Sequence, residues 1–375
     1  MDALVDKIIE CKIEDIPFDE IPINERFGLI VYKNNVKYEF LIHLKSDSKN
    51  LVCFGSGALN GSDLKRFEQK PRFNRQSWKI NESTLFYNDP TRYLNNSMLG
   101  GWGIGTTDDW YLENIKEIIL KIKEFYEIKN ENILFYGSSL GGFTSMLLGT
   151  LVKDSKVLAD VPQLTFENAK YFQHIKHIVF PDLSDEEIKN NYNYRLNVLD
   201  LIKKEKYIPN AYIIFDAGEI DIKEHYTHFF AELNKITECN NSNRMKIIIN
   251  PINEHKFMSM EETLDVIQQA CDNNLLCFGD ELYSSDINKE LEKIKLKIEP
   301  EIIEVKNEIN AINEITAMKN TEIHELDEII TQKDAEIHEL NLKNKQLEIK
   351  FNEISTSTTW KLTKPLRKFL DLFKK

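Results

Sequence analysis

Hydrophobic and polar positions divide the first 280 residues into short apolar runs separated by polar or amphipathic stretches. Two β-rich runs, 27–31 and 38–44, are joined through Lys33-Asn34-Asn35 and predict an antiparallel hairpin at a sheet edge. The other apolar runs predict strands at 51–54, 85–87, 133–136, 156–161, 211–215 and 245–249. Residues 1–26, before this pattern, are expected to form an acidic lead-in.

Amphipathic helices separate several of these strands. Residues 108–126 place apolar side chains at helical spacing, with Asp108 or Asp109 as the expected N-cap. Helices that alternate with strands are typical of α/β proteins whose mostly parallel sheet is covered on both faces. We therefore predict this fold for residues 27–280, with a helical, lid-like insertion at 165–206.

From Ile302 onward the apolar spacing changes to a heptad repeat. With Ile302 at position a, twelve of the sixteen a and d positions are apolar, and Glu322–Leu326 is repeated as Glu336–Leu340. This pattern predicts a coiled coil over 285–355, and Ile at a with Leu at d favours a parallel homodimer. A single long helix folded back on the first domain is the alternative. Pro300 is the expected joint between the domains.

The last segment, 356–375, carries six basic residues and one acidic residue, interleaved with apolar side chains. A basic amphipathic segment of this kind binds the interface of an anionic membrane, and each basic residue adds on the order of 1 kcal/mol. We therefore expect the tail to hold the protein at a membrane surface. The alternative is a basic tail that only keeps the chain soluble.

Composition argues against nucleic-acid binding, a disulfide framework and a zinc site. The formal net charge of -13 disfavours general binding to nucleic acid. Five cysteines without a C-x-x-C spacing indicate neither a disulfide framework nor a zinc site, and no metal is expected. The N-terminus has acids where a signal peptide has bases, so we expect a cytoplasmic protein, peripheral to the inner face of the cell membrane.

The pattern G-x-S-x-G follows the apolar run at 133–136 and precedes an apolar helical stretch, which makes Ser139 the candidate nucleophile. A serine at a sharp strand-to-helix turn projects its hydroxyl above the sheet, and the flanking glycines avoid collisions at that turn. The alternative is a glycine-rich connection whose serine caps the helix. Ser138 is the expected structural serine.

An acyl-transfer site needs two backbone amides to bind the oxyanion. One is expected from Leu140, after the nucleophile, and the other from the loop after the strand at 51–54, at Ser56 and Gly57. Serine also needs a histidine as base and an acid that orients the histidine. His255 follows the last predicted strand.

Two aspartates compete for the role of the acid. Asp221 lies in the loop beyond the strand at 211–215 and is preferred, while Asp216 at the strand end is the alternative. The loop residues Arg75, Trp78 and Trp102 are candidates for binding a sugar or an anionic group, and structural arginine–carbonyl bonds in a folded lid are an equal alternative.

The order of Gly137-Ser138-Ser139-Leu140-Gly141, Asp221 and His255 resembles the α/β-hydrolase superfamily, over about residues 27–275. Within it the chain resembles bacterial serine acyl-enzymes of surface-glycan and capsule loci. The tail sequence Trp-Lys-Leu-Thr-Lys-Pro-Leu-Arg, from Trp360, looks like the end of many glycosyltransferases from such loci. The chain departs from the superfamily in its Gly-Ser-Gly oxyanion loop.

The resemblance implies an O-acetyltransferase or esterase that acts on a capsule or surface polysaccharide or its precursor. No bound cofactor is expected, and acetyl-CoA is a candidate acyl donor. The sequence does not distinguish transfer to a sugar hydroxyl from transfer to water. The rival interpretation is a non-catalytic, hydrolase-like scaffold that organises glycan assembly at the membrane.

Overall fold

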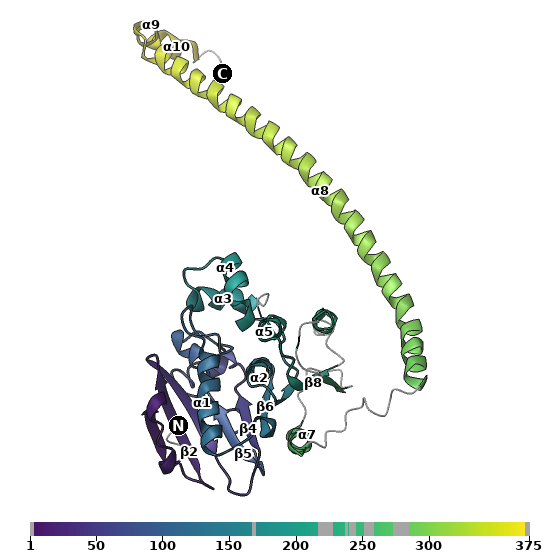
Figure 1. The fold of residues 1–375 in the computed structure, drawn as a ribbon. Coiled ribbons are helices and arrows are strands. Elements are labelled where there is room, and N and C mark those ends of the chain that lie inside the picture. Colours follow the sequence, from purple (N-terminus) through teal and green to yellow (C-terminus); the bar gives the residue numbers. More distant parts are fainter. Residues whose placement is uncertain are drawn as a thin grey trace. The chain divides into compact units, whose positions relative to one another are not determined.

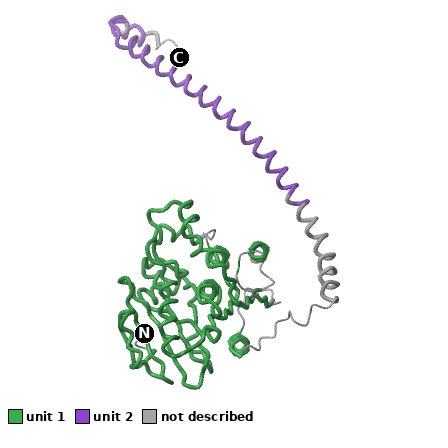
Figure 2. The backbone as a smooth tube through the Cα atoms, in the orientation of Figure 1, with its two compact units in different colours: residues 1–281 green, residues 282–375 purple. Residues whose placement is uncertain are grey.

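The computed structural model describes residues 4–166, 170–216, 228–236, 239, 245–250, 259–272 and 285–371. The chain forms two compact units, residues 1–281 and 282–375, which Figure 2 shows in different colours. The predicted residues Asp221 and His255 lie outside the described residues.

The described part of the first unit contains a nine-stranded sheet with the order β1-β2-β3-β5-β4-β6-β7-β8-β9 (Figure 1). The strands are β1 (Ile8–Lys12), β2 (Arg26–Lys33), β3 (Val36–His43), β4 (Leu51–Gly55), β5 (Ser83–Tyr87), β6 (Ile133–Ser138), β7 (Lys156–Asp160), β8 (Asn210–Asp216) and β9 (Lys246–Asn250). Six of the eight neighbouring pairs are parallel, and only β2–β3 and β3–β5 are antiparallel. The predicted mostly parallel sheet is confirmed.

The predicted hairpin is β2–β3. Its turn residues Asn34 and Asn35 both have positive φ, 52° and 61°, as a two-residue turn that follows the twist of the strands requires. Outside this hairpin, β1 pairs with β2 in parallel, so part of the expected lead-in belongs to the sheet. Ile9 is buried there, while its neighbour Glu10 is exposed. Only Ile9 and Cys11 of β1 face the core, and two residues are too few to give a periodic signal in the sequence.

Helices cover both faces of the sheet. Phe135 on β6 packs in one core cluster with α1 (Tyr111–Phe125), α2 (Leu140–Leu151) and α5 (Val198–Glu205). The alternate residue Tyr136 packs in a second cluster with α7 (Met260–Cys271). The two faces of one strand are therefore buried under different helices, as the α/β prediction requires.

The expected cap of α1 is not found. The N-cap is Trp110, whose side chain makes no capping hydrogen bond. Asp109 instead accepts a hydrogen bond from the side chain of Asn114 at 2.7 Å. The helix begins later than predicted because Asp109 lies in the preceding loop, where its carbonyl accepts from the amide of Thr106 at 2.9 Å.

The insertion between β7 and β8 contains α3 (Lys170–Val179), α4 (Asp185–Tyr192) and α5 (Figure 1). Arg195, between α4 and α5, anchors it to the loop before α1. The buried guanidinium donates to the carbonyl oxygens of Ile104 at 3.3 Å and Thr106 at 2.7 Å. It also lies within 5.8 Å of the ring centroid of Trp110. Arg195 therefore holds the insertion against the loop that precedes α1.

The second unit consists of α8 (Ser285–Thr356), α9 (Thr358–Leu362) and α10 (Lys364–Asp371). Because α8 continues through Pro300, the prediction that this proline marks the joint is wrong. Large apolar side chains at a and d positions are exposed along α8: Ile312, Ile323, Leu326, Ile330, Ile337, Leu340, Leu347, Phe351 and Ile354. No helix within the described residues is both long and apolar enough to cross a membrane.

Candidate functional site

Ser139 occupies a strained turn between β6 and α2. Its backbone has φ 51° and ψ -118°, a combination that side-chain-bearing residues rarely adopt. The Ser139 amide donates to the carbonyl of Asp160 on β7 at 3.0 Å, and its carbonyl accepts from the amide of Phe143 in the first turn of α2 at 3.0 Å. Bonds on both sides of the residue hold it in this conformation.

The Ser139 hydroxyl has no hydrogen-bond partner among the described residues. The side chain makes no capping hydrogen bond to α2, so the alternative role as a helix cap does not describe this serine. Ser139 is half-buried, whereas Ser138 is buried and accepts a hydrogen bond from Arg75 Nη2 at 2.9 Å. The two serines thus differ as expected: one is tied into the structure, and the other has its hydroxyl unengaged among the described residues.

The glycines at this turn are explained by close backbone contacts. A Cβ atom on Gly137 would lie 2.3 Å from the carbonyl of Gly141. A Cβ atom on Gly141 would lie 2.7 Å from the carbonyl oxygen of Gly55. Since real Cβ atoms do not approach so closely, only glycine fits both positions. The second contact also shows that the loop after β4 lies directly against the turn.

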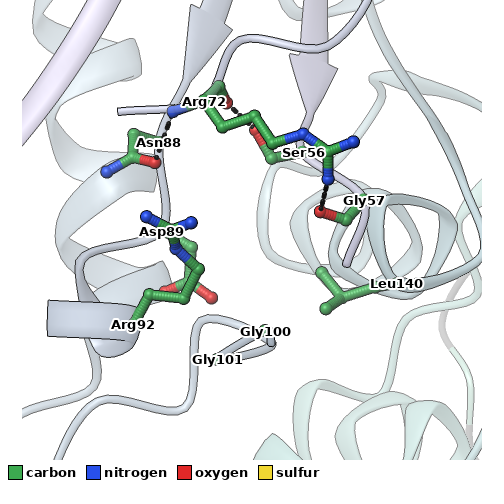
Figure 3. A pocket seen from close by; sticks show the side chains of 9 residues that line it. All are labelled: Ser56, Gly57, Arg72, Asn88, Asp89, Arg92, Gly100, Gly101 and Leu140. Carbon is green, nitrogen blue, oxygen red and sulfur yellow. Dashed lines mark hydrogen bonds between the residues drawn. The ribbon is translucent and has the colours of Figure 1, made fainter. Parts of the chain in front are cut away.

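The predicted oxyanion loop and Leu140 line one hollow, drawn in Figure 3. Ser56 and Gly57 come from the loop after β4, and Leu140 is the first residue of α2, whose amide has no acceptor within the helix. The other lining residues are Arg72, Asn88, Asp89, Arg92, Gly100 and Gly101. The hollow is narrow: its accessible volume is about 10 Å³, room for about one water molecule.

Arg75 and Trp78 support the serine turn from the α7 face of the sheet. Beside its bond to Ser138, the Arg75 guanidinium lies 5.1 Å from the Trp78 ring centroid and 5.2 Å from that of Tyr136. Burial raises the pKa of Tyr136 to about 12, against the opposing charge of Arg75, so its hydroxyl stays protonated near neutral pH. These contacts hold Arg75 and Trp78 against the residues that precede Ser139.

Trp102 is packed inside the domain. Its side chain is 4% exposed, its ring stacks on Phe166 at 4.0 Å between centroids, and its indole N–H donates to Gln163 Oε1 at 2.7 Å. Arg72 and Arg92 donate to backbone carbonyls. One nitrogen of each of these arginines therefore holds the loops together, and the buried Trp102 ring is not exposed as a platform for a sugar.

Sheet order accounts for the convergence of distant segments. Strands β4, β5 and β6 are parallel neighbours, so their carboxyl ends meet at one edge and bring together Gly55, Asn88 and Ser139. β8 and β9 end at the same edge, at Asp216 and Asn250. The chain after these ends, which carries Asp221 and His255, lies outside the described residues.

The polar residues of the hollow that come from the segment after β5 and from the loop before β5 were not predicted from the sequence. Asn88 and Asp89 follow β5 directly, Arg92 lies in the next turn, and Arg72 precedes the strand. The signal was their position at a carboxyl strand end, where sites of parallel sheets are built. No group of three or more metal-ligating side chains occurs within the described part of the chain.

No family model and no curated protein matches the chain. Among solved structures, it is similar to the capsule O-acetyltransferase of Neisseria meningitidis serogroup A, with 16% identity and a TM-score of 0.47 over 64% of this chain and 96% of that one. An S-formylglutathione hydrolase from Staphylococcus aureus is similar with 12% identity and a TM-score of 0.41, over 67% of this chain and 96% of that one.

An esterase from Thermogutta terrifontis is similar with 10% identity and a TM-score of 0.41, over 70% of this chain and 96% of the esterase. Because these identities and TM-scores are low, we assign the α/β-hydrolase-type fold from the sheet order and the Ser139 turn.

Proposed function

We propose that the protein is a serine acyl-enzyme that transfers an acyl group to a saccharide hydroxyl or to water. The observation that carries the proposal is the Ser139 turn: a strained residue with an unengaged hydroxyl, set against the loop of Gly55, Ser56 and Gly57. Strain of this kind persists only where the surrounding structure holds it, and it is common at active sites. No cofactor is needed beyond the acyl donor.

In the proposed mechanism, His255 accepts the proton of the Ser139 hydroxyl as the oxygen attacks the acyl carbon. The tetrahedral oxyanion is bound by the amides of Leu140 and of Ser56 or Gly57. When the intermediate collapses, the bond to the leaving group breaks, and the leaving group takes the proton from His255. An acceptor hydroxyl or water then gives its proton to His255 and attacks the acyl carbon. As this second intermediate collapses, the ester bond to Ser139 breaks, and His255 returns the proton to the serine oxygen.

The acid that orients His255 is Asp221 in this proposal, with Asp216 as the alternative. Asp216 is the last residue of β8, and Asp221 follows it by five residues in the sequence. The proposed acceptor is a bacterial capsule or surface glycan or its precursor, which rests on the resemblance of the tail to enzymes of such loci. Acetyl-CoA is the proposed donor.

Incubation with acetyl-CoA tests the proposal. We expect the intact protein to gain the mass of one acetyl group, mapped to Ser139, and to lose it when a saccharide acceptor is added. Rapid release of free acetate without an acceptor would identify an esterase instead. Absence of an acetylated Ser139 together with no turnover of a simple ester would contradict the proposal.

We also propose that the tail binds the inner face of the cell membrane. The amphipathic helix α10 follows directly after α9, Leu362 and Leu366 are 76% and 67% exposed, and the basic residues Lys361, Lys364, Arg367 and Lys368 lie among them. Exposed apolar area together with cations is what an anionic interface binds.

Deletion of residues 356–375 should therefore move the protein from the membrane fraction to the soluble fraction. Sedimentation with vesicles that contain anionic lipid measures this, and neutral vesicles are the control. Equal sedimentation of the full-length and shortened proteins would rule out the tail as the anchor.

We propose, finally, that α8 forms a parallel coiled-coil homodimer. Leu326 and Leu340 at d positions are 57% and 59% exposed in the single chain, as are further a and d residues along the helix. A stripe of this length remains in water unless another helix covers it. The same stripe suits the rival scaffold function, so the chemistry of Ser139 must distinguish the two.

A further inference from the structure

Arg92 is a buried cation with unused donors beside the proposed oxyanion site. The residue is 8% exposed, and its Nη2 donates to the carbonyl oxygens of Phe67 at 3.0 Å and Lys70 at 2.9 Å. Its Nε and Nη1 are buried and have no hydrogen-bond partner among the described residues. The side chain lines the same hollow as Gly57 and Leu140 (Figure 3). Unpaired donors on a buried charge are costly, which indicates that a ligand completes them.

A second guanidinium faces the same hollow. Arg72 Nη1 donates to the carbonyl oxygens of Gly57 at 3.3 Å and Ala58 at 2.5 Å, so it is held against the oxyanion loop. Burial lowers the pKa of Arg72, the charge of Asp63 opposes this, and the charge of Arg92 lowers the pKa further. Both arginines line one hollow, so an anion bound there would meet two cations.

Among the described residues, no carboxylate forms an ion pair with Arg72 or Arg92, although the charge of Asp63 acts on Arg72. Asp89 also lines the hollow, but its Oδ1 accepts from the Thr91 amide at 3.0 Å and its Oδ2 from the Gly103 amide at 2.9 Å. Among the described residues, no carboxylate oxygen lies within 4.0 Å of a nitrogen of either arginine. Burial raises the pKa of the Asp89 carboxyl, although the two amides and Arg92 act in the opposite direction. Asp89 thus holds the loop at Gly103 and forms no ion pair with either arginine.

We propose that Arg72 and Arg92 bind an anionic oxygen of the acceptor, from a phosphate or carboxylate next to the hydroxyl that reacts at Ser139. The inference rests on the proposed function and narrows the acceptor to an acidic saccharide. The narrow hollow has room for one oxygen of such a group, beside Leu140 and Gly57. The phosphates of CoA suit the site less well, because the pantetheine arm separates them from the thioester.

Binding of inorganic phosphate tests the site without catalysis. Isothermal titration at constant ionic strength should show that Arg92→Gln weakens phosphate binding by about 10-fold or more, since a hydrogen bond to a charged group contributes about 1.5–3 kcal/mol. The matched control is Arg66→Gln, which removes an exposed arginine that does not line the hollow and should change the dissociation constant by less than about 2-fold. Arg72→Gln gives a second, independent variant if Arg92→Gln does not fold. Equal phosphate binding by wild type and the folded variants would overturn the proposal.

Two kinetic comparisons identify the source of the anion. With the wild type, kcat/KM should be about 10- to 100-fold higher for a hexose 6-phosphate as acceptor than for the unphosphorylated hexose. Arg92→Gln should remove this preference. As donors, acetyl-CoA and acetyl-pantetheine should respond equally to Arg92→Gln; a selective loss with acetyl-CoA would assign the site to CoA and overturn the acceptor proposal.

The outcomes separate the inference from the function on which it rests. Turnover of p-nitrophenyl acetate, without a preference for the phosphorylated acceptor and without Arg92-dependent phosphate binding, would refute the anion site and leave the acyl-enzyme intact. Phosphate binding that depends on Arg92, in a protein that turns over no ester, would refute the acyl-enzyme and leave the anion site.

Discussion

Ser139→Ala should abolish labelling by a fluorophosphonate probe and reduce the turnover of p-nitrophenyl acetate by about 10³-fold or more. Loss of the nucleophile removes the covalent route, and what remains is the contribution of the oxyanion site and of binding. The probe reacts only with a serine whose proton is accepted by a base, so labelling reports activation as well as position. Gel fluorescence and peptide mass mapping measure the labelled residue.

The neighbouring serine provides the matched control. Ser138→Ala removes the acceptor of Arg75 and should lower the free energy of unfolding by about 1–3 kcal/mol, because a buried donor loses its partner. It leaves the Ser139 hydroxyl in place, so labelling of the folded protein should persist. Labelling that survives in Ser139→Ala would contradict the assignment of the nucleophile. A folded wild type that takes up no probe would favour the scaffold.

The double variant Leu326→Lys, Leu340→Lys should convert a dimer into a monomer. Both leucines occupy d positions. Burying two charges per helix in the seam destabilises the dimer by more than the remaining apolar contacts stabilise it. Analytical ultracentrifugation should show the mass falling from twice 43.9 kDa to 43.9 kDa. Circular dichroism of the same samples shows whether α8 stays helical once it is unpaired.

The control for this variant lies on the same helix. Leu342 is 50% exposed, like the two d-position leucines, but it occupies position f, opposite the seam. Leu342→Lys adds a charge where solvent surrounds it and should leave the dimer intact. A monomeric wild type, or a Leu342→Lys variant that dissociates as readily, would contradict the heptad assignment and leave the long single helix as the alternative.

The sequence by itself determined the features whose cause is local. The Asn34-Asn35 turn, the apolar runs of the parallel strands and the turn at Ser139 each follow from a few adjacent residues. Positive φ selects asparagine or glycine, and a buried strand selects consecutive apolar side chains. The glycines beside Ser139 predict a tight turn for the same reason, since their backbones come too close for any side chain.

Only the tertiary structure decided what depends on contacts between distant segments. β1 belongs to the sheet because it pairs with the outer edge of β2. Trp102 is buried because the ring of Phe166 stacks on it. Arg92 became part of the candidate site in the same way: β4 lies between β5 and β6, so the turn after β5 is carried to the loop at Gly57. Strand order is set by the packing of the whole sheet, and no local pattern of residues states which strands become neighbours.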